Sequence, residues 1–324
     1  MAKQRRLGVA LGSGSARGWA HVGVLRALAE EDIVPDFVAG CSMGAMVGAS
    51  FAAGTIAQLE TWALALNLKG VVGLLDFGFR GGLIKGNRLL DFFHGQCTVC
   101  QFSELPVPFA VVATDLVSGQ EIWLREGKVS DAVRASCTVP GLFPPVLHDG
   151  RYLVDGSIVN PVPVSLCRAM GAEVVIAVDL GSNRERRFVA DPRVTNDPPA
   201  RRRFAGALRP WRGKGAAALQ RGALLPSPSM ANTLLGAIDI MQEAIAQRRL
   251  ASEPPDVLLT PALASVGPFE YHRAALAIAE GRKAVAQMLP QIRAALAGQD
   301  SAASAKTGPV RSNLNIVGGG SRWP

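Results

Sequence analysis

The chain has 324 residues, of which 48% are hydrophobic, and a formal net charge of +8. This hydrophobic fraction excludes a disordered chain, and 35 glycines with only 6% aromatic residues are typical of an α/β protein with buried strands and short connections. No run approaches the roughly eighteen apolar residues of a membrane span, and the N-terminal apolar run is shorter than the roughly seven residues of a secretory signal, so we expect a cytoplasmic protein able to contact membranes.

The first 60 residues alternate between strand and helix patterns. An apolar run at 6–11 predicts a strand, a Gly/Ser loop follows at 12–15, and an apolar stripe predicts a helix over 16–31. A second strand is predicted at 36–40 and a helix of small residues at 43–53. This order is typical of a parallel sheet covered by helices.

The alternation continues to about residue 297. We expect strands at 109–115, 121–125, 151–154, 173–180 and 256–260, and helices at 130–136, 162–170, 231–251 and 270–297. Ser130 is the expected N-cap of its helix, and Pro290 is expected to bend the last one. The pattern predicts one α/β domain over 5–297, with a central, mostly parallel sheet and helices on both faces, and a disordered tail at 298–324.

A basic segment lies at 184–214, where ten Lys and Arg residues face three Asp and Glu residues. Its four prolines predict an extended loop. One alternative is a solvated loop. The other is peripheral contact with an anionic membrane, where each basic residue contributes on the order of 1 kcal/mol and Phe204, Leu208 and Trp211 enter the interface. Because no nucleic-acid recognition motif accompanies the charge, we expect no nucleic-acid partner.

The five cysteines are scattered through apolar surroundings, which favours a reducing compartment over a disulfide framework. Cys97 and Cys100 form the C-x-x-C motif of the chain, and His94 lies nearby. A zinc site needs a fourth ligand, which the spacing does not supply. We therefore expect incidental buried cysteines and no bound metal.

Gly40, Ser42 and Gly44 form a G-x-S-x-G motif between a predicted strand and a predicted helix. Small residues on either side of the serine let the chain reverse sharply and leave the hydroxyl exposed above the carboxyl edge of the sheet. A simple tight turn is the alternative, because glycine and serine are ordinary turn residues. The context makes Ser42 a candidate nucleophile.

The loop at 12–18 is a candidate oxyanion site. It fails as a dinucleotide-binding fingerprint, because Arg17 stands where a third glycine is required and Asp36 opens the second strand instead of closing it. The backbone N–H groups of Gly14 and Ser15, at a helix N-terminus, suit a developing negative charge. Arg17 is expected to steady the loop or to add positive potential.

The catalytic base has two candidates. His272 is the one histidine late enough for the Ser, Asp, His order of an α/β-hydrolase, but it lies in a helical pattern and not on a loop after a final strand. Asp155 ends an apolar strand, and Gly156 follows it in a tight turn. A carboxylate alone can take the serine proton if burial raises its proton affinity. For Asp155 the alternative is a turn-forming aspartate.

These motifs, in this order, resemble the patatin-like phospholipases, and within them the compact bacterial members similar to the catalytic region of neuropathy target esterase. The family pattern is a glycine-rich loop ending in Arg-Gly, then G-x-S-x-G, then Asp-Gly followed by Gly or Ala. Here these blocks stand at 13–18, 40–44 and 155–157. The runs at 113–119 and 135–145 resemble further family blocks. The likeness covers about residues 5–182, with a weaker echo in the helix from 270.

The resemblance implies a three-layer patatin-like architecture and a Ser-Asp dyad of Ser42 and Asp155 with no histidine and no cofactor. Three serines depart from the family pattern: Ser13 and Ser15 replace loop glycines, and Ser157 replaces the usual Gly or Ala. Serine keeps the backbone N–H that an oxyanion needs where its φ and ψ angles are allowed.

The sequence therefore predicts a serine acyl hydrolase acting on lipid or lysophospholipid esters through an acyl-serine intermediate. A triad hydrolase or acyltransferase using His272 stays open as one alternative. The other is a non-catalytic regulator or membrane-associated scaffold that has kept the fold.

Overall fold

The computed structural model describes residues 5–74, 101–181 and 230–298. The basic segment at 184–214, the group of His94, Cys97 and Cys100, and the tail beyond residue 298 lie outside the described residues, so the expectations for them stay predictions.

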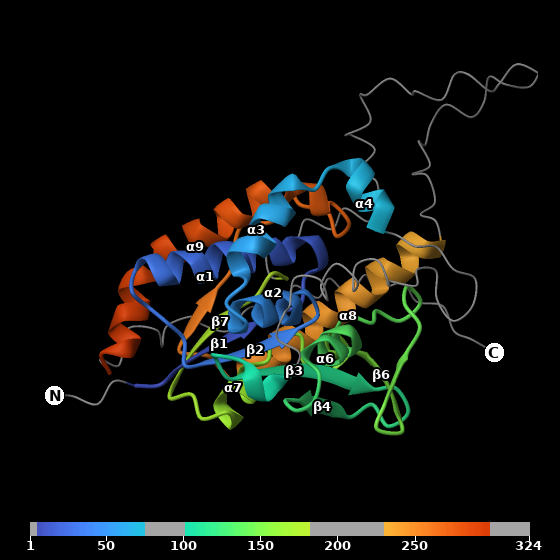
Figure 1. The fold of residues 1–324 in the computed structure, drawn as a ribbon, viewed down its shortest axis with the longest axis horizontal. Coiled ribbons are helices and arrows are strands. Elements are labelled where there is room, and N and C mark those ends of the chain that lie inside the picture. Colours follow the sequence, from blue (N-terminus) through green and yellow to red (C-terminus); the bar gives the residue numbers. More distant parts are fainter. Residues whose placement is uncertain (1–4, 75–100, 182–229, 299–324) are drawn as a thin grey trace, which may run out of the picture.

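An eight-stranded sheet forms the middle layer of the described part (Figure 1). Its strands are β1 (Leu7–Leu11), β2 (Phe37–Cys41), β3 (Phe109–Asp115), β4 (Glu121–Leu124), β5 (Val146–His148), β6 (Arg151–Asp155), β7 (Val174–Val178) and β8 (Val257–Leu259). They lie in the order β5-β6-β3-β2-β1-β7-β8, and β4 also pairs with β3. Strands β3, β2, β1, β7 and β8 are parallel, whereas β4, β5 and β6 form antiparallel pairs.

Helices cover both faces of this sheet. They are α1 (Ala20–Glu30), α2 (Met43–Ala52), α3 (Ile56–Ala65), α4 (Leu68–Leu74), α6 (Val129–Ser136), α7 (Val164–Ala169), α8 (Met230–Ser252) and α9 (Ala274–Leu296). Short 3-10 helices are η1 (Ser15–Trp19), η2 (Phe102–Glu104), η3 (Gly156–Ile158) and η4 (Tyr271–Arg273).

Two hydrophobic cores lie on opposite faces of the sheet, because successive strand side chains point to opposite sides. Val9 and Leu11 of β1 pack in the core that takes in α1, α2, α3, α6 and α9. Ala10, between them, packs in the smaller core under α7 and α8. Both faces of β1 are buried, which explains its continuous apolar run. The predicted α/β class, with a mostly parallel sheet between helical layers, is confirmed.

Strands β2 and β6 share one edge of β3 and meet end to end. Cys41, the last residue of β2, pairs with Val112, and Asp155, the last residue of β6, pairs with Ala113. Because β4 occupies the other edge of β3 from residue 111 to 114, β2 and β6 must lie on the same side. The antiparallel course of β6 therefore brings its carboxyl end against the carboxyl end of β2.

The elements predicted within the described residues are present, but α3, α4 and β5 were not predicted. The helix expected over 270–297 is the 3-10 helix η4 followed by α9. The helix expected over 16–31 is two helices, η1 and then α1, because Arg17 N–H donates to Gly14 O in a 3-10 turn. The prediction that Ser130 caps α6 is wrong: Lys128 is the N-cap, and its side chain makes no capping hydrogen bond. The helix expected from 162 begins at Val164, after Pro163, and the strands from Glu121 and Phe109 pair as predicted.

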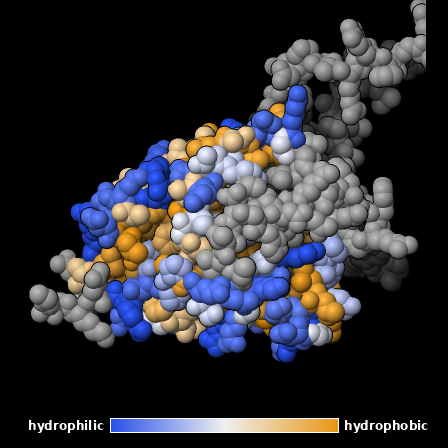
Figure 2. Space-filling view, in the orientation of Figure 1, coloured by the Kyte–Doolittle hydropathy of each residue, from blue (hydrophilic) through white to orange (hydrophobic). Residues whose placement is uncertain are grey.

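Figure 2 shows hydrophilic and hydrophobic residues interspersed on this face, with hydrophobic residues near β6 and also on the opposite flank near α1 and α9. The exposed large apolar side chains of the turn after β3 and of the β5–β6 hairpin are Leu116, Val117, Leu147 and Tyr152. In the described ranges we find no helix that combines the length and apolarity needed to cross a bilayer.

Candidate active site

Ser42 stands at the point where β2 ends and α2 begins. Its backbone has φ 54° and ψ −120°, a left-handed conformation that is costly for a residue with a Cβ. Ser42 N–H donates to Ser136 Oγ at 2.8 Å, which ties the turn to the end of α6. The strained turn is the geometry expected for a nucleophile elbow.

The two glycines beside Ser42 are required by close packing. A Cβ added at Gly40 would lie 2.5 Å from the Ala45 Cα, and one at Gly44 would overlap the carbonyl oxygen of Leu11. Any larger residue would therefore push α2 away from β1 or open the turn. The G-x-S-x-G spacing is thus a packing requirement as well as a sequence motif.

Asp155 lies against Ser42 because of the end-to-end meeting of β6 and β2. The Ser42 hydroxyl donates to Asp155 Oδ2 at 2.7 Å, and Asp155 is 1% exposed. Its backbone is held on both sides: its N–H donates to Thr138 O at 2.8 Å, and Thr114 Oγ1 donates to its carbonyl at 2.8 Å. A Cβ at Gly156 would overlap the Val112 carbonyl, so the turn after Asp155 also needs glycine.

The electrostatic environment of Asp155 favours proton uptake. Burial raises the pKa of the Asp155 carboxyl, while hydrogen bonds from Ser157 and Ser42 act in the opposite direction. The raised pKa makes the carboxylate a stronger base than a solvated aspartate, as a proton transfer from serine requires.

The loop before η1 presents two backbone N–H groups without an assigned acceptor among the described residues. Gly12 N–H donates to Val178 O at 3.1 Å and Ser13 N–H to Pro161 O at 2.8 Å, which anchors the loop, whereas Gly14 and Ser15 have no such acceptor. All four residues precede or begin η1. Gly14 and Ser15 both line the pocket that contains Ser42 and Asp155. Their N–H groups are therefore available to an oxyanion.

Ser15, which departs from the glycine of the family pattern, is accommodated at φ 51°. Its hydroxyl donates to Pro268 O at 2.5 Å and lies 3.0 Å from the Tyr271 hydroxyl. The side chain is thus held by the segment before α9. Hydrogen bonding of this kind offsets part of the cost of a left-handed serine.

Arg17 and His21 hold the same loop from behind. Arg17 Nε donates to Val266 O at 2.9 Å, and burial lowers its pKa while the charge of Glu270 raises it. This contact fits the steadying role expected of Arg17. His21 Nε2 donates to Gly12 O at 2.7 Å, and burial lowers the pKa of His21 to about 4, so the ring is neutral at pH 7. The sequence analysis did not identify His21.

Comparison with known proteins identifies the family. A sequence model of patatin-like phospholipases matches residues 9–168, which include Ser42 and Asp155. An uncharacterized NTE family protein of Mycobacterium bovis is 33% identical over 335 residues, covering 88% of this chain and 91% of that protein. The chain belongs to the patatin-like phospholipase family.

A mammalian relative named for the same domain is similar over a shorter stretch. Patatin-like phospholipase domain-containing protein 6 of Mus musculus is 33% identical over 187 residues, which are 55% of this chain and 14% of the mouse protein. A crystal structure of VipD from Legionella pneumophila has 14% identity and a TM-score of 0.35, covering 57% of this chain and 51% of that one, which is too distant to inform the site.

Two further elements of this patatin-like fold line the pocket, and the sequence analysis missed both. The first is α8, which contributes Ile238, Asp239 and Gln242, and the second is the segment before η4, which contributes Pro268 and Phe269. Gln242 Nε2 donates to Ser157 Oγ at 2.6 Å. No short motif marks these positions, because α8 reaches the pocket only through its packing on the sheet face opposite α2.

His272 does not line the pocket, and the described residues form no metal-binding group. His272 lies in η4 and is not among the residues that line the pocket with Ser42. Within the described ranges there is no group of three or more His, Cys, Asp or Glu side chains able to hold a metal ion.

Proposed function

We propose that this chain is a serine acyl hydrolase in which Ser42 is the nucleophile and Asp155 the general base. The observation that carries the proposal is the 2.7 Å hydrogen bond from the Ser42 hydroxyl to the buried Asp155 carboxyl group, with both residues lining one pocket. Membership of the patatin-like phospholipase family implies a lipid hydrolase. We therefore propose lipid esters, including phospholipids and lysophospholipids, as substrates.

In the acylation step, Asp155 Oδ2 takes the proton of Ser42 Oγ as this oxygen attacks the acyl carbonyl carbon. The N–H groups of Gly14 and Ser15 donate to the oxyanion that forms. When the tetrahedral intermediate collapses, the bond to the leaving alcohol breaks and Asp155 returns the proton to the alcohol oxygen. The product is an acyl ester on Ser42.

In the deacylation step, water attacks the acyl-serine. Asp155 takes a proton from this water, the same two N–H groups bind the second oxyanion, and the proton returns to Ser42 Oγ as the fatty acid leaves. The serine acts as nucleophile and then as leaving group, and the aspartate acts as base and then as acid. The proposed steps require no cofactor.

The test is hydrolysis of a short p-nitrophenyl ester by purified full-length protein. Ser42→Ala and Asp155→Asn are each expected to lower kcat/KM by at least about a thousandfold, because each removes a group that acts in both steps. Ser252→Ala is the matched control, since this serine donates to Arg249 O on the outer part of α8 and does not line the pocket. A Ser42→Ala variant that still hydrolyses the ester at the wild-type rate contradicts the proposal.

The triad and scaffold alternatives are separated by two further measurements. His272→Ala is expected to keep most of the activity, whereas a triad using His272 predicts a loss of several orders of magnitude. A fluorophosphonate probe is expected to label Ser42, as read by mass spectrometry. A folded protein that forms no adduct favours the non-catalytic scaffold.

A cytoplasmic location with peripheral membrane contact through 184–214 stays a prediction. If that segment recruits anionic membranes, binding to anionic liposomes is expected to weaken as salt increases. Salt-independent binding contradicts it.

A further inference from the structure

Ser157 is the residue of the Asp-Gly motif where this chain departs from the family pattern, and it is almost fully buried beside the candidate base. Its backbone N–H donates to Asp155 Oδ1 at 2.8 Å, on the oxygen that does not accept from Ser42. Its hydroxyl accepts a hydrogen bond from Gln242 Nε2 at 2.6 Å. A serine hydroxyl thus stands between the carboxyl group and α8.

Ser157 contacts two partners through two different groups. Its hydroxyl is held by Gln242 of α8, and its backbone N–H is directed at the Asp155 carboxyl group. Three hydrogen bonds therefore link Gln242, Ser157, Asp155 and Ser42, and Asp155 accepts from the Ser157 N–H on Oδ1 and from the Ser42 hydroxyl on Oδ2.

We propose that Gln242 and Ser157 are a positioning pair for Asp155, in which Gln242 holds the Ser157 hydroxyl and so keeps the Ser157 N–H aligned on the carboxylate that accepts the Ser42 proton. The inference rests on the proposed roles of Ser42 and Asp155. A donor to the carboxylate stabilises its charged form and so opposes the effect of burial. The pair thus keeps a deeply buried base ionised at a lower pH than burial alone would allow.

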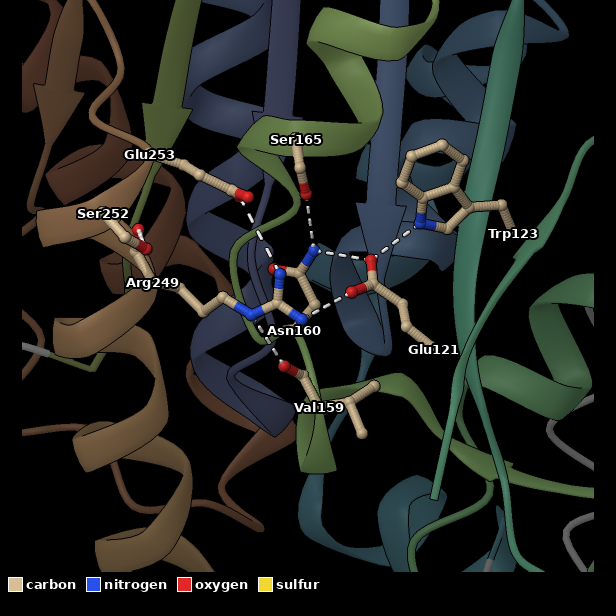
Figure 3. Close-up of polar contacts among 8 residues, drawn as sticks. All are labelled: Glu121, Trp123, Val159, Asn160, Ser165, Arg249, Ser252 and Glu253. Carbon is tan, nitrogen blue, oxygen red and sulfur yellow. Dashed lines mark hydrogen bonds and ion pairs between the residues drawn. The ribbon is translucent and has the colours of Figure 1, made fainter. Parts of the chain in front are cut away.

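The position of Gln242 is fixed by a second contact on the same helix. Arg249, two turns further along α8, donates from Nη2 to Glu121 Oε2 at 2.7 Å and from Nε to Val159 O at 3.2 Å. Figure 3 shows Arg249 reaching from α8 toward Glu121 and the Val159 carbonyl. Residues 157 and 159 both lie on the short segment after Asp155, so α8 is hydrogen-bonded to this segment at two points.

Several titratable or charged groups surround Asp155. They are Cys41 at the end of β2, Cys137 after α6, Tyr271 in η4, Glu121 on β4, and Arg17 and Asp239 in the pocket wall. Burial raises the pKa of both thiols and of the Tyr271 phenol, so these groups stay neutral as the medium is acidified from neutral pH. Asp239 is the other carboxyl group in the pocket wall, and the experiment must separate it from Asp155.

The experiment measures kcat/KM for a p-nitrophenyl ester as a function of pH. Ser157→Ala keeps the backbone N–H but removes the hydroxyl that Gln242 holds. We expect the poorer alignment of this N–H on Asp155 Oδ1 to move the acid limb upward by about half to one pH unit, up to the size of one net hydrogen bond. Gln242→Leu is expected to move it in the same direction by less. In the Ser157→Ala background, Gln242→Leu is expected to add nothing, because its effect passes through the missing hydroxyl.

Ser165→Ala is the matched control. The Ser165 hydroxyl also accepts from an amide side chain, Asn160 Nδ2 at 3.1 Å (Figure 3). The hydrogen bonds to the Asp155 carboxyl group come from Ser42 and Ser157. The acid limb of Ser165→Ala is expected to coincide with that of the wild type. The Ser157→Ala shift is also measured in an Asp239→Asn background, where a shift of the same size assigns it to Asp155.

Two outcomes overturn the inference. One is a folded Ser157→Ala variant whose acid limb coincides with the wild type, even if kcat falls at every pH, because a purely structural role predicts that result. The other is a Gln242→Leu shift that persists in full without the Ser157 hydroxyl. Failure of the dyad itself is recognised separately, by activity that survives in Ser42→Ala and Asp155→Asn.

Discussion

The two walls of the pocket are held in place by different kinds of contact. On the Ser42 side, backbone lies directly on backbone: Gly44 of α2 fits against the Leu11 carbonyl, and Gly156 fits against the Val112 carbonyl. On the α8 side, side chains span the gap: Gln242 reaches Ser157, and Arg249 reaches Glu121. Backbone contacts leave no room for adjustment, whereas hydrogen-bonded side chains adapt by rotating. We therefore expect substitutions on the Ser42 side to have the larger effects.

Gly44→Ala tests the backbone side and has the largest expected effect. The new methyl group would overlap the Leu11 carbonyl, so α2 must shift and carry Ser42 with it. A displacement on the order of 1 Å costs about a hundredfold in rate, and we expect kcat/KM to fall by at least that factor. Gly70→Ala is the matched control, because Gly70 is also a helix glycine but its nearest neighbour would lie 3.6 Å from the added Cβ. Equal activity of the two folded variants contradicts the comparison.

His21 is the exception on the Ser42 side, since its buried side chain supports the loop at 12–18 through Gly12 O. Its pKa is about 4 in the folded protein against 6.5 for the ordinary group, so between these values the unfolded state binds more protons. Stability from this group is full above about pH 6.5 and is lost as pH falls toward 4, by up to about 3 kcal/mol. Thermal unfolding of wild type and His21→Gln at several pH values measures this loss. A wild type whose Tm falls with acidification no more than that of His21→Gln contradicts the assignment.

Glu121→Gln tests the side-chain side with a smaller expected effect. The Glu121 carboxylate accepts from Trp123 Nε1, Asn160 Nδ2 and Arg249 Nη2, each at 2.7 Å (Figure 3). The substitution removes the negative charge and replaces one acceptor oxygen with an NH2 donor, which faces the donors of the three partners. We therefore expect the free energy of unfolding to fall by about 1–3 kcal/mol. Denaturant titration measures the change.

Trp123→Phe is the matched control for Glu121→Gln and has the smallest expected effect. It removes one of the same three hydrogen bonds at a side chain that is 43% exposed, so water replaces the lost partner. The expected loss is below about 1 kcal/mol. If Trp123→Phe lowers the free energy of unfolding as much as Glu121→Gln does, the hydrogen bonds from Asn160 and Arg249 to Glu121 contribute little to stability.

Much of the fold and half of the pocket could be predicted from sequence, for a physical reason. Strands β1, β3 and β7 are buried on both faces, so their apolar runs are continuous. Gly40 and Gly44 mark a turn that has no room for a larger residue. Such requirements act between neighbours in the chain and leave short patterns. The N-cap of α6 was predicted wrongly because Lys128 makes no side-chain capping hydrogen bond, so the sequence has no typical capping residue at the start of this helix.

The sequence by itself determined the α/β alternation, the nucleophile turn and the candidate pair of Ser42 and Asp155. Only the tertiary structure decided that β6 runs antiparallel against the end of β2, which brings these two side chains to 2.7 Å, and that Gln242 of α8 reaches the segment after Asp155. Contacts of this kind join residues 85 or 113 positions apart, and their geometry depends on strand order and helix packing. Strand order and helix packing leave no short pattern in the sequence, because side chains such as Gln242 would be equally acceptable on a solvated surface.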